Sequence, residues 1–136
     1  MSVRSYRLKE VAQLLGVSDD TVRRWAERGR FITVIDGAGH RVVEGPELAR
    51  FAQEVAAAAD SPIAAGATSA RNRMVGLVTR VIRDTVMAQV EMQAGPYRLV
   101  SLMSREAADD LALEPGVLAA AVVKSTNVVV ETVDRH

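Results

Sequence analysis

Residues 55–68 divide this chain into two parts with different patterns of apolar side chains, and this division constrains the fold most. The segment is rich in alanine, lacks aromatic side chains and contains Pro62 and Gly66, which end helices. Before it, apolar residues recur at helical spacing. After it, short β-branched runs dominate. We therefore expect two domains, residues 1–56 and 68–136, joined by a linker over residues 57–67.

Composition narrows the class of protein. The chain has 136 residues, which is room for one ordinary domain or two very small ones. It has no cysteine, which excludes disulfides and thiolate zinc sites. There is neither the apolar core of a signal peptide at the N-terminus nor a run long enough to span a membrane. A cytoplasmic protein is the expectation.

Two short helices joined by a tight turn are expected over residues 8–15 and 21–27. Gly16 suits a left-handed helix end, and the Ser18 hydroxyl can accept from orphan amides of the second helix. Apolar side chains recur at helical spacing in both segments. They are Leu8, Val11, Ala12 and Leu15 in the first, and Val22, Trp25 and Ala26 in the second.

A β-hairpin should follow these helices. Residues 31–35 read as one strand, 36–39 as a tight turn, and 40–43 as the returning strand. Pro46 then opens a further helix over residues 47 to about 55. The first domain is thus a helix-turn-helix with a hairpin behind it.

Basic side chains lie where such a unit would meet DNA. Net charge is zero, with 17 basic and 17 acidic residues, so bulk charge does not predict nucleic-acid binding. Between residues 23 and 41, however, five arginines face only two acidic residues. In a helix-turn-helix the second helix enters the major groove, and a wing can touch the backbone or the minor groove. The candidate DNA-binding residues are Ser18, Thr21, Arg23, Arg24, Arg28, His40 and Arg41.

The same residues carry a family resemblance. Residues 6–12, residues 21–25 and the Gly39-His40-Arg41 triplet resemble the winged helix-turn-helix of the MerR and excisionase type. The resemblance covers about residues 4 to 55. It implies DNA binding by the second helix and the wing, commonly as a dimer on paired half-sites. The alternative interpretation is that Arg23, Arg24 and Arg28 form an ordinary solvated helix face.

The second domain is expected to be a five-stranded OB-like β-barrel with one helix, which makes the whole chain α+β. A helix over residues 105–111, with Ser104 as N-cap, follows the third strand. Gly76 is expected at a bend in the long first strand. The strands are expected at residues 74–84, 86–94, 97–103, 117–124 and 128–133.

Two short motifs in this domain offer hydrogen-bond donors and almost no negatively charged acceptors. They are residues 69–72, Ser-Ala-Arg-Asn, and residues 124–127, Lys-Ser-Thr-Asn. Hydroxyls, amides and one or two cations suit a tetrahedral oxyanion, because charge-assisted hydrogen bonds are the strong ones. If the fold brings these motifs together, they form a small oxyanion pocket.

Residues 69–76, 111–116 and 123–128 resemble the molybdopterin-associated Mop domain, the single-copy form of the TOBE fold. The resemblance covers about residues 68 to 134 and implies binding of molybdate or tungstate between subunits. One departure is Thr126-Asn127, because the late motif of the family more often reads Lys-Ala-Ser or Lys-Ser-Ser. By motif match, the implied oxyanion-binding residues are Ser69, Ala70 through its backbone amide, Arg71, Ser101, Lys124 and Ser125.

The leading hypothesis is a molybdate- or tungstate-responsive DNA-binding transcription regulator that acts as a homo-oligomer, a dimer or higher. A cytoplasmic storage protein, with the first domain serving assembly, is the alternative. A barrel used only for assembly is the plainest interpretation of the second domain. No Ser–His–acid arrangement, metal-ligand cluster or phosphate loop supports an enzyme.

Overall fold

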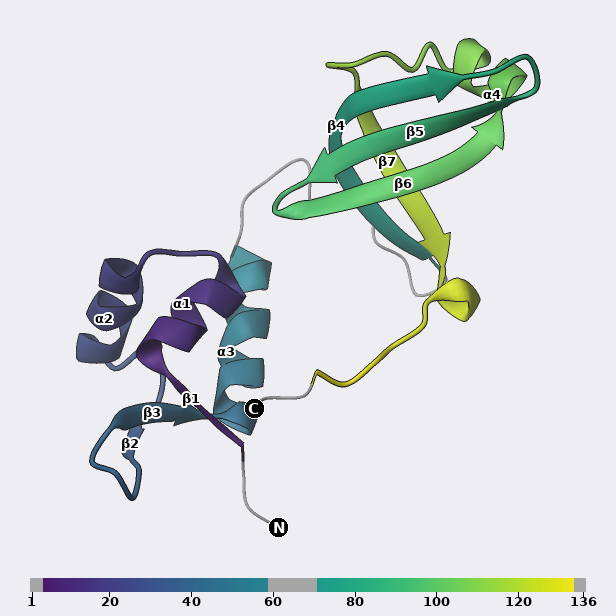
Figure 1. Cartoon of the computed structure of the whole chain (residues 1–136). Coiled ribbons are helices and arrows are strands. Elements are labelled where there is room, and N and C mark those ends of the chain that lie inside the picture. The colour runs from purple at the N-terminus through teal and green to yellow at the C-terminus, as the bar shows by residue number, and fades with distance from the viewer. Residues whose placement is uncertain (1–3, 59–70, 134–136) are drawn as a thin grey trace. The chain divides into compact units, whose positions relative to one another are not determined.

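The computed structural model describes residues 4–58 and 71–133. The chain divides into two compact units, Met1–Asp60 and Ser61–His136. The first is mostly helical and the second is a curled β-sheet with one short helix, which confirms the predicted α+β class (Figure 1). Among the described residues, no helix is long and apolar enough to cross a membrane.

The helix-turn-helix forms as the sequence predicts. Helix α1 spans Leu8–Leu15 and ends at Gly16, whose φ of 69° is left-handed. Helix α2 spans Asp19–Glu27, and the Ser18 hydroxyl caps it by accepting from the Thr21 amide at 3.1 Å. Val11, Ala12, Val22 and Ala26 are buried, so the apolar faces of the two helices form the core.

The hairpin joins a three-stranded sheet that sequence reasoning did not predict in full. Strands β1 (Ser5–Arg7), β2 (Val34–Ile35) and β3 (Arg41–Glu44) lie in the order β1-β3-β2. The expected strand over residues 31–35 is confirmed only for its last two residues. Phe31 turns into the core, and the Ile32 amide donates to the Glu47 carboxylate at 2.6 Å instead of to a strand.

Helix α3 (Gly45–Ala58) closes the first unit. It buries Phe51 completely, and the ring of Phe51 lies 5.2 Å from Trp25 and 4.9 Å from Phe31 between centroids. Aromatic pairs in this range add to the stability gained from burial alone. The core therefore fixes α2 and the hairpin on one scaffold.

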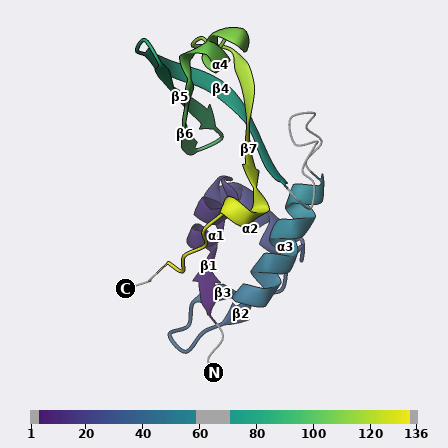
Figure 2. The same cartoon turned by 90° about the vertical axis from the view of Figure 1, so that its right-hand side faces the viewer.

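The second unit is a four-stranded antiparallel sheet, ordered β6-β5-β4-β7. The strands are β4 (Arg71–Arg83), β5 (Met87–Ala94), β6 (Tyr97–Ser104) and β7 (Leu118–Lys124), with α4 (Arg105–Asp110) between β6 and β7. Ser104 caps α4 as predicted, because its hydroxyl accepts from the Ala107 amide at 3.1 Å. The first part of β4, residues 71–77, pairs with the whole of β7, and Figure 2 shows the two strands approaching each other at this end.

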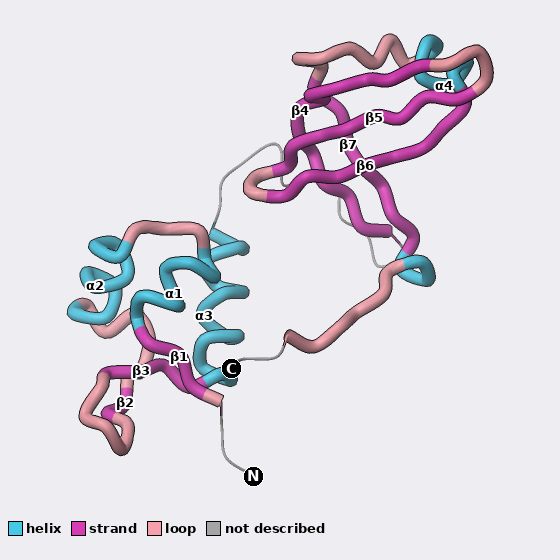
Figure 3. The backbone as a smooth tube through the Cα atoms, in the orientation of Figure 1, coloured by secondary structure: helices cyan, strands magenta, loops and turns pink. Residues whose placement is uncertain are grey.

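The prediction of a fifth strand over residues 128–133 is wrong for the described chain. After β7 the backbone makes a single 3₁₀ turn, Ser125–Asn127, and continues without strand pairing (Figure 3). The valines of this stretch favour β structure, but a strand also needs a neighbouring edge to pair with. The sheet is therefore curled and not closed into a five-stranded barrel by its own described residues.

The predicted linker lies mostly outside the described residues. Helix α3 continues to Ala58, so residues 57 and 58 are helical. Residues 59–67 fall in the part of the chain that the structure does not describe.

Candidate functional site

The second helix of the helix-turn-helix presents its polar face to solvent. Ser18 accepts from the Thr21 amide, and the Thr21 hydroxyl lies 2.9 Å from the Ser18 hydroxyl and 3.4 Å from Nη2 of Arg24. These contacts hold the start of α2 in one conformation. In helix-turn-helix proteins, this N-terminal part of the second helix is the one that meets base edges.

The arginines of this region do not all lie on the same exposed face. Arg23, Arg24 and Arg28 are exposed, and Arg23 makes a long ion pair with Asp20, at 4.0 Å. Arg30 lies instead against the core, with its guanidinium 5.8 Å from the Trp25 ring and 3.4 Å from Glu54. Arg30 is thus a structural residue, and the exposed cations of α2 are those proposed from the sequence.

The hairpin between β2 and β3 is held by a carboxylate. The Asp36 side chain accepts from the amides of His40 at 2.8 Å and Ala38 at 2.9 Å. The hydrogen bond from the His40 amide is the main cause that holds the pKa of Asp36 below its ordinary value of 3.8; burial opposes it, and the bond from the Ala38 amide adds to it. The anion thus orders the loop that carries His40.

Both predicted wing residues have fixed positions. Nε of Arg41 donates to the Thr33 hydroxyl at 2.9 Å across the hairpin. Nη2 of Arg7 lies 3.1 Å from Nδ1 of His40. Arg7 is therefore a wing cation that sequence reasoning missed, because β1 has only three residues and pairs with the distant β3.

The described residues of the two donor motifs meet at one end of the sheet. Arg71 opens β4 and Lys124 closes β7, and the antiparallel register places them directly opposite each other. The Asn72 side chain donates to the Val123 carbonyl at 3.3 Å and ties the two strand ends together. Asn72, which was not predicted as a site residue, therefore positions the pair.

This pair concentrates positive charge. Residues directly opposite on an antiparallel pair share a face, and like charges there are destabilising. Both side chains are exposed, and within residues 4–58 and 71–133 neither makes an ion pair with an acidic residue. Two neighbouring cations without a carboxylate are suited to an anion from solution.

The other predicted oxyanion residues differ in their placement. Ser125 follows Lys124 directly, in the 3₁₀ turn. Ser69 and Ala70 lie outside the described residues. Ser101 lies on β6, which forms the other edge of the curled sheet from β7.

Comparisons with known proteins match the two units separately. A helix-turn-helix domain model matches residues 5–56, and a TOBE domain model matches residues 68–130. The molybdenum-pterin-binding protein 3 of Clostridium pasteurianum is 36% identical over 63 residues, which are 46% of this chain and 93% of the relative. The chain belongs to the TOBE-domain family of molybdenum-pterin-binding proteins. Its TOBE domain is fused to a helix-turn-helix domain that precedes it.

Two solved structures resemble the TOBE domain. One is a molybdate binding protein from Sporomusa ovata, 31% identical, with a TM-score of 0.46 over 49% of this chain and all of the other. The second is MopII from Clostridium pasteurianum in an apo form, also 31% identical, with a TM-score of 0.45 over 48% of this chain and all of the other.

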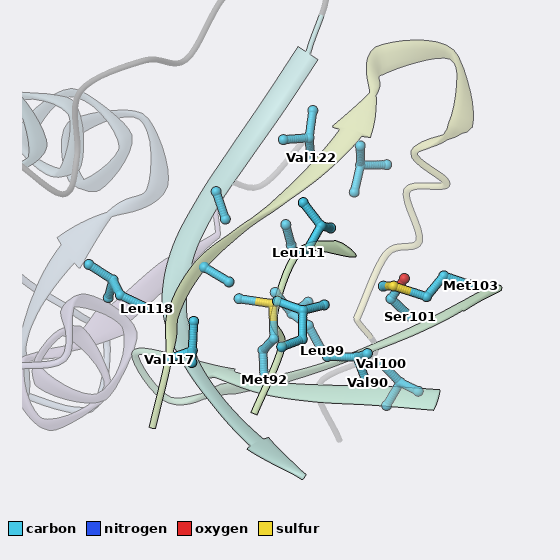
Figure 4. A pocket seen from close by; sticks show the side chains of 15 residues that line it. Val90, Met92, Leu99, Val100, Ser101, Met103, Leu111, Val117, Leu118 and Val122 are labelled. Atoms are coloured by element: carbon cyan, nitrogen blue, oxygen red, sulfur yellow. The ribbon is translucent and has the colours of Figure 1, made fainter. Parts of the chain in front are cut away.

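The TOBE domain also contains an apolar groove of about 480 Å³ between its two edge strands. Figure 4 shows side chains entering it from β5 and β6 on one side and from β7 on the other. Ser101 lies in this lining, among Leu99, Val100 and Met103. The groove is thus chemically distinct from the Arg71–Lys124 pair.

Proposed function

We propose that this protein is a DNA-binding transcription regulator that responds to molybdate or tungstate. The observation that carries the proposal is the Arg71–Lys124 pair, two cations opposite each other at the meeting point of the two donor motifs. A tetrahedral oxyanion between them would relieve their repulsion and accept their hydrogen bonds. The name of the similar Clostridium pasteurianum protein, a molybdenum-pterin-binding protein, supports a molybdenum compound as the class of ligand.

The proposed anion site uses residues from both strand ends. Arg71 and Lys124 supply charge, and Ser125 supplies a hydroxyl and an amide next to Lys124. Ser69 and Ala70 precede β4 directly in the sequence and are proposed to complete the donors. Ser101 is proposed to contribute from a second subunit, since within one chain it lies on the opposite edge of the sheet.

In the helix-turn-helix domain, the proposed DNA contacts are those of α2 and the hairpin. Arg24 lies on the exposed face of α2, Arg28 follows at the end of this helix, and His40, Arg41 and Arg7 lie on the wing. Phosphate contacts position such a domain, and side chains at the start of α2 read bases. The proposal includes a homo-oligomer, because two helix-turn-helix domains are needed to read two paired half-sites.

Calorimetry tests the anion site. Molybdate and tungstate should bind to the full-length protein with measurable heat, and Lys124→Ala should weaken binding at least tenfold, because one charge-assisted partner is lost. Lys9→Ala is the matched control, since Lys9 is the other lysine of the chain and lies exposed on α1. Equal affinity of the Lys124→Ala variant and the natural protein for these anions would refute the proposed site.

DNA binding separates the regulator from a storage protein. Arg24→Glu should abolish binding to a duplex selected from a random pool and leave molybdate binding unchanged. Arg80→Glu, the same charge change on exposed β4, is the control. If the natural protein shows no DNA affinity that falls with salt concentration, the storage function is favoured instead.

A further inference from the structure

The imidazole of His40 lies between a guanidinium and a carboxylate at the wing. Nη2 of Arg7 is 3.1 Å from Nδ1 of His40, and Oδ1 of Asp36 is 3.7 Å from the same nitrogen. The two neighbours favour different states of the ring, because a guanidinium needs an acceptor and a carboxylate favours a protonated nitrogen. Nδ1 can serve only one of them.

The Asp36 carboxylate is occupied by the backbone of the turn. Its Oδ1 atom accepts from the His40 amide at 2.8 Å and from the Ala38 amide at 2.9 Å, and these two bonds use both lone pairs of the oxygen. The distance of 3.7 Å to Nδ1 is also longer than a hydrogen bond. Asp36 therefore orders the turn and does not bind the His40 ring through a hydrogen bond.

The Arg7 side chain determines the state of the ring. A guanidinium has donors and no acceptor, and it does not lose its proton in proteins, so Nδ1 must accept the bond at 3.1 Å. An accepting Nδ1 carries no proton, and the neutral ring then holds its proton on Nε2. A charged imidazole would lose this bond and place a second positive charge beside Arg7.

The backbone of Arg7 is fixed by the body of the domain. Arg7 pairs with Val42 on β3, and its amide donates to the Glu10 side chain of α1 at 3.2 Å. The guanidinium thus reaches the wing from the junction of β1 and α1. The His40 side chain is 46% exposed, and among residues 4–58 and 71–133 none accepts a hydrogen bond from its Nε2 atom. The Nε2–H group is available to an acceptor outside the chain.

We propose that Arg7 is a positioning residue that keeps His40 neutral, and that the Nε2–H group of His40 donates to a phosphate oxygen of DNA. This contact rests on the proposed DNA binding by the wing. Polar side chains make many of the contacts to the DNA backbone. Arg41, the next residue of the hairpin, is a cation whose Nε atom is held by Thr33. The wing thus offers a neutral donor at His40 and a positive charge at Arg41.

The salt dependence of DNA binding separates a neutral donor from a cation. A cation that neutralises a phosphate releases counterions, so its removal flattens the slope of log affinity against log salt concentration by about 0.9. With the full-length protein and a selected duplex at pH 7.5, His40→Ala should weaken binding about three- to tenfold and leave the slope unchanged. Arg41→Ala is the matched comparison, and it should flatten the slope by about 0.9.

Each other result of this experiment has one meaning. A slope that flattens by about 0.9 in His40→Ala would show that His40 binds as a charged imidazolium, which overturns the proposal. Unchanged affinity of His40→Ala would overturn it as well. A natural protein that binds no duplex at all would refute the proposed function, and this contact with it.

Two substitutions of His40 test which ring nitrogen donates. A glutamine side chain places its amide N–H near the position of Nε2, whereas an asparagine side chain places it near the position of Nδ1. His40→Gln should therefore keep the DNA affinity within about threefold of the natural protein, and His40→Asn should bind as weakly as His40→Ala. Equal affinity of the two amide variants would contradict a donor at Nε2.

A double-mutant cycle tests whether Arg7 acts through His40. Arg7→Ala should weaken DNA binding of the natural protein. In the His40→Ala background the further loss should be smaller by about threefold, because part of the effect of Arg7 passes through the ring. Losses that multiply fully would mean that Arg7 acts only through contacts of its own.

Nitrogen NMR of the free protein reads the tautomer directly. The chain has two histidines, so the ring signals of His40 are identified by their loss in His40→Gln. At pH 7.5, Nδ1 of His40 should give the resonance of an unprotonated ring nitrogen and Nε2 that of a protonated one. A protonated Nδ1 in the natural protein would overturn the proposal.

Discussion

Gly76 shows how a single residue fixes the curl of the TOBE domain. A Cβ at this position would overlap the carbonyl oxygen of Gln93 and lie 2.9 Å from Cα of Ala94. These are backbone atoms of β5, so they cannot swing aside as a side chain could. At Gly76, where the sequence predicts a bend, β4 closely approaches β5, and an irregularity in the register follows between Val78 and Arg80.

Replacing this glycine should weaken the second domain selectively. We expect Gly76→Ala to lower its free energy of unfolding by about 1–3 kcal/mol, because the methyl group forces two strands apart. Chemical denaturation followed by circular dichroism measures the change. Gly37→Ala is the control, since a Cβ there meets nothing within 4 Å, and unchanged stability of Gly76→Ala would contradict the close approach.

The residue types also determine which residues of the candidate sites could be predicted from the sequence. Lys124 and Arg71 were found from their motifs, and the register then placed them opposite each other. Arg7 was missed because its role depends on His40, which is close only after β1 pairs with β3. Local patterns identify donors, but they do not say which donors of distant segments meet.

At the scale of elements, local signals predicted helices better than strands. The Ser18 and Ser104 caps and the Gly16 turn act within one helical turn, so α1, α2 and α4 formed close to their expected bounds. The strand expected at residues 128–133 failed because its valines specify β propensity and not a partner. Likewise, Phe31 left its expected strand because the aromatic core offered more burial.

The turn between β4 and β5 gives a pH-dependent prediction. The Asp84 carboxylate accepts from the amides of Met87 at 2.6 Å and Val86 at 2.7 Å, and these bonds lower its pKa below 3.8. A lowered folded-state pKa means that the stabilisation is present above pH 3.8 and is lost as the pH falls through the folded value.

Asp84→Asn should therefore be less stable than the natural protein at pH 7, because a neutral amide oxygen accepts more weakly than a carboxylate. The difference in melting temperature should shrink as the pH falls below 3.8. Thermal unfolding across pH 2 to 7 measures it. A difference that stays constant over this range would mean that the charge of Asp84 has no role in the turn.

At the scale of the whole molecule, one chain carries a helix-turn-helix domain and a TOBE domain, and the proposed anion site lies in the TOBE domain. An oxyanion alters DNA binding only if it binds the DNA-competent and DNA-incompetent arrangements with different affinity. The coupling is reciprocal, so DNA must change the affinity for the anion by the same factor. This reciprocity distinguishes a sensor from two independent binding domains on one chain.

The most direct test is the affinity of the full-length protein for a selected duplex, by fluorescence anisotropy, with and without saturating molybdate at fixed salt. The dissociation constant should change at least fivefold in one direction, in keeping with ordinary allosteric coupling. The change should disappear in Lys124→Ala. An unchanged dissociation constant, in a protein that binds both molybdate and DNA, would contradict the proposed regulation.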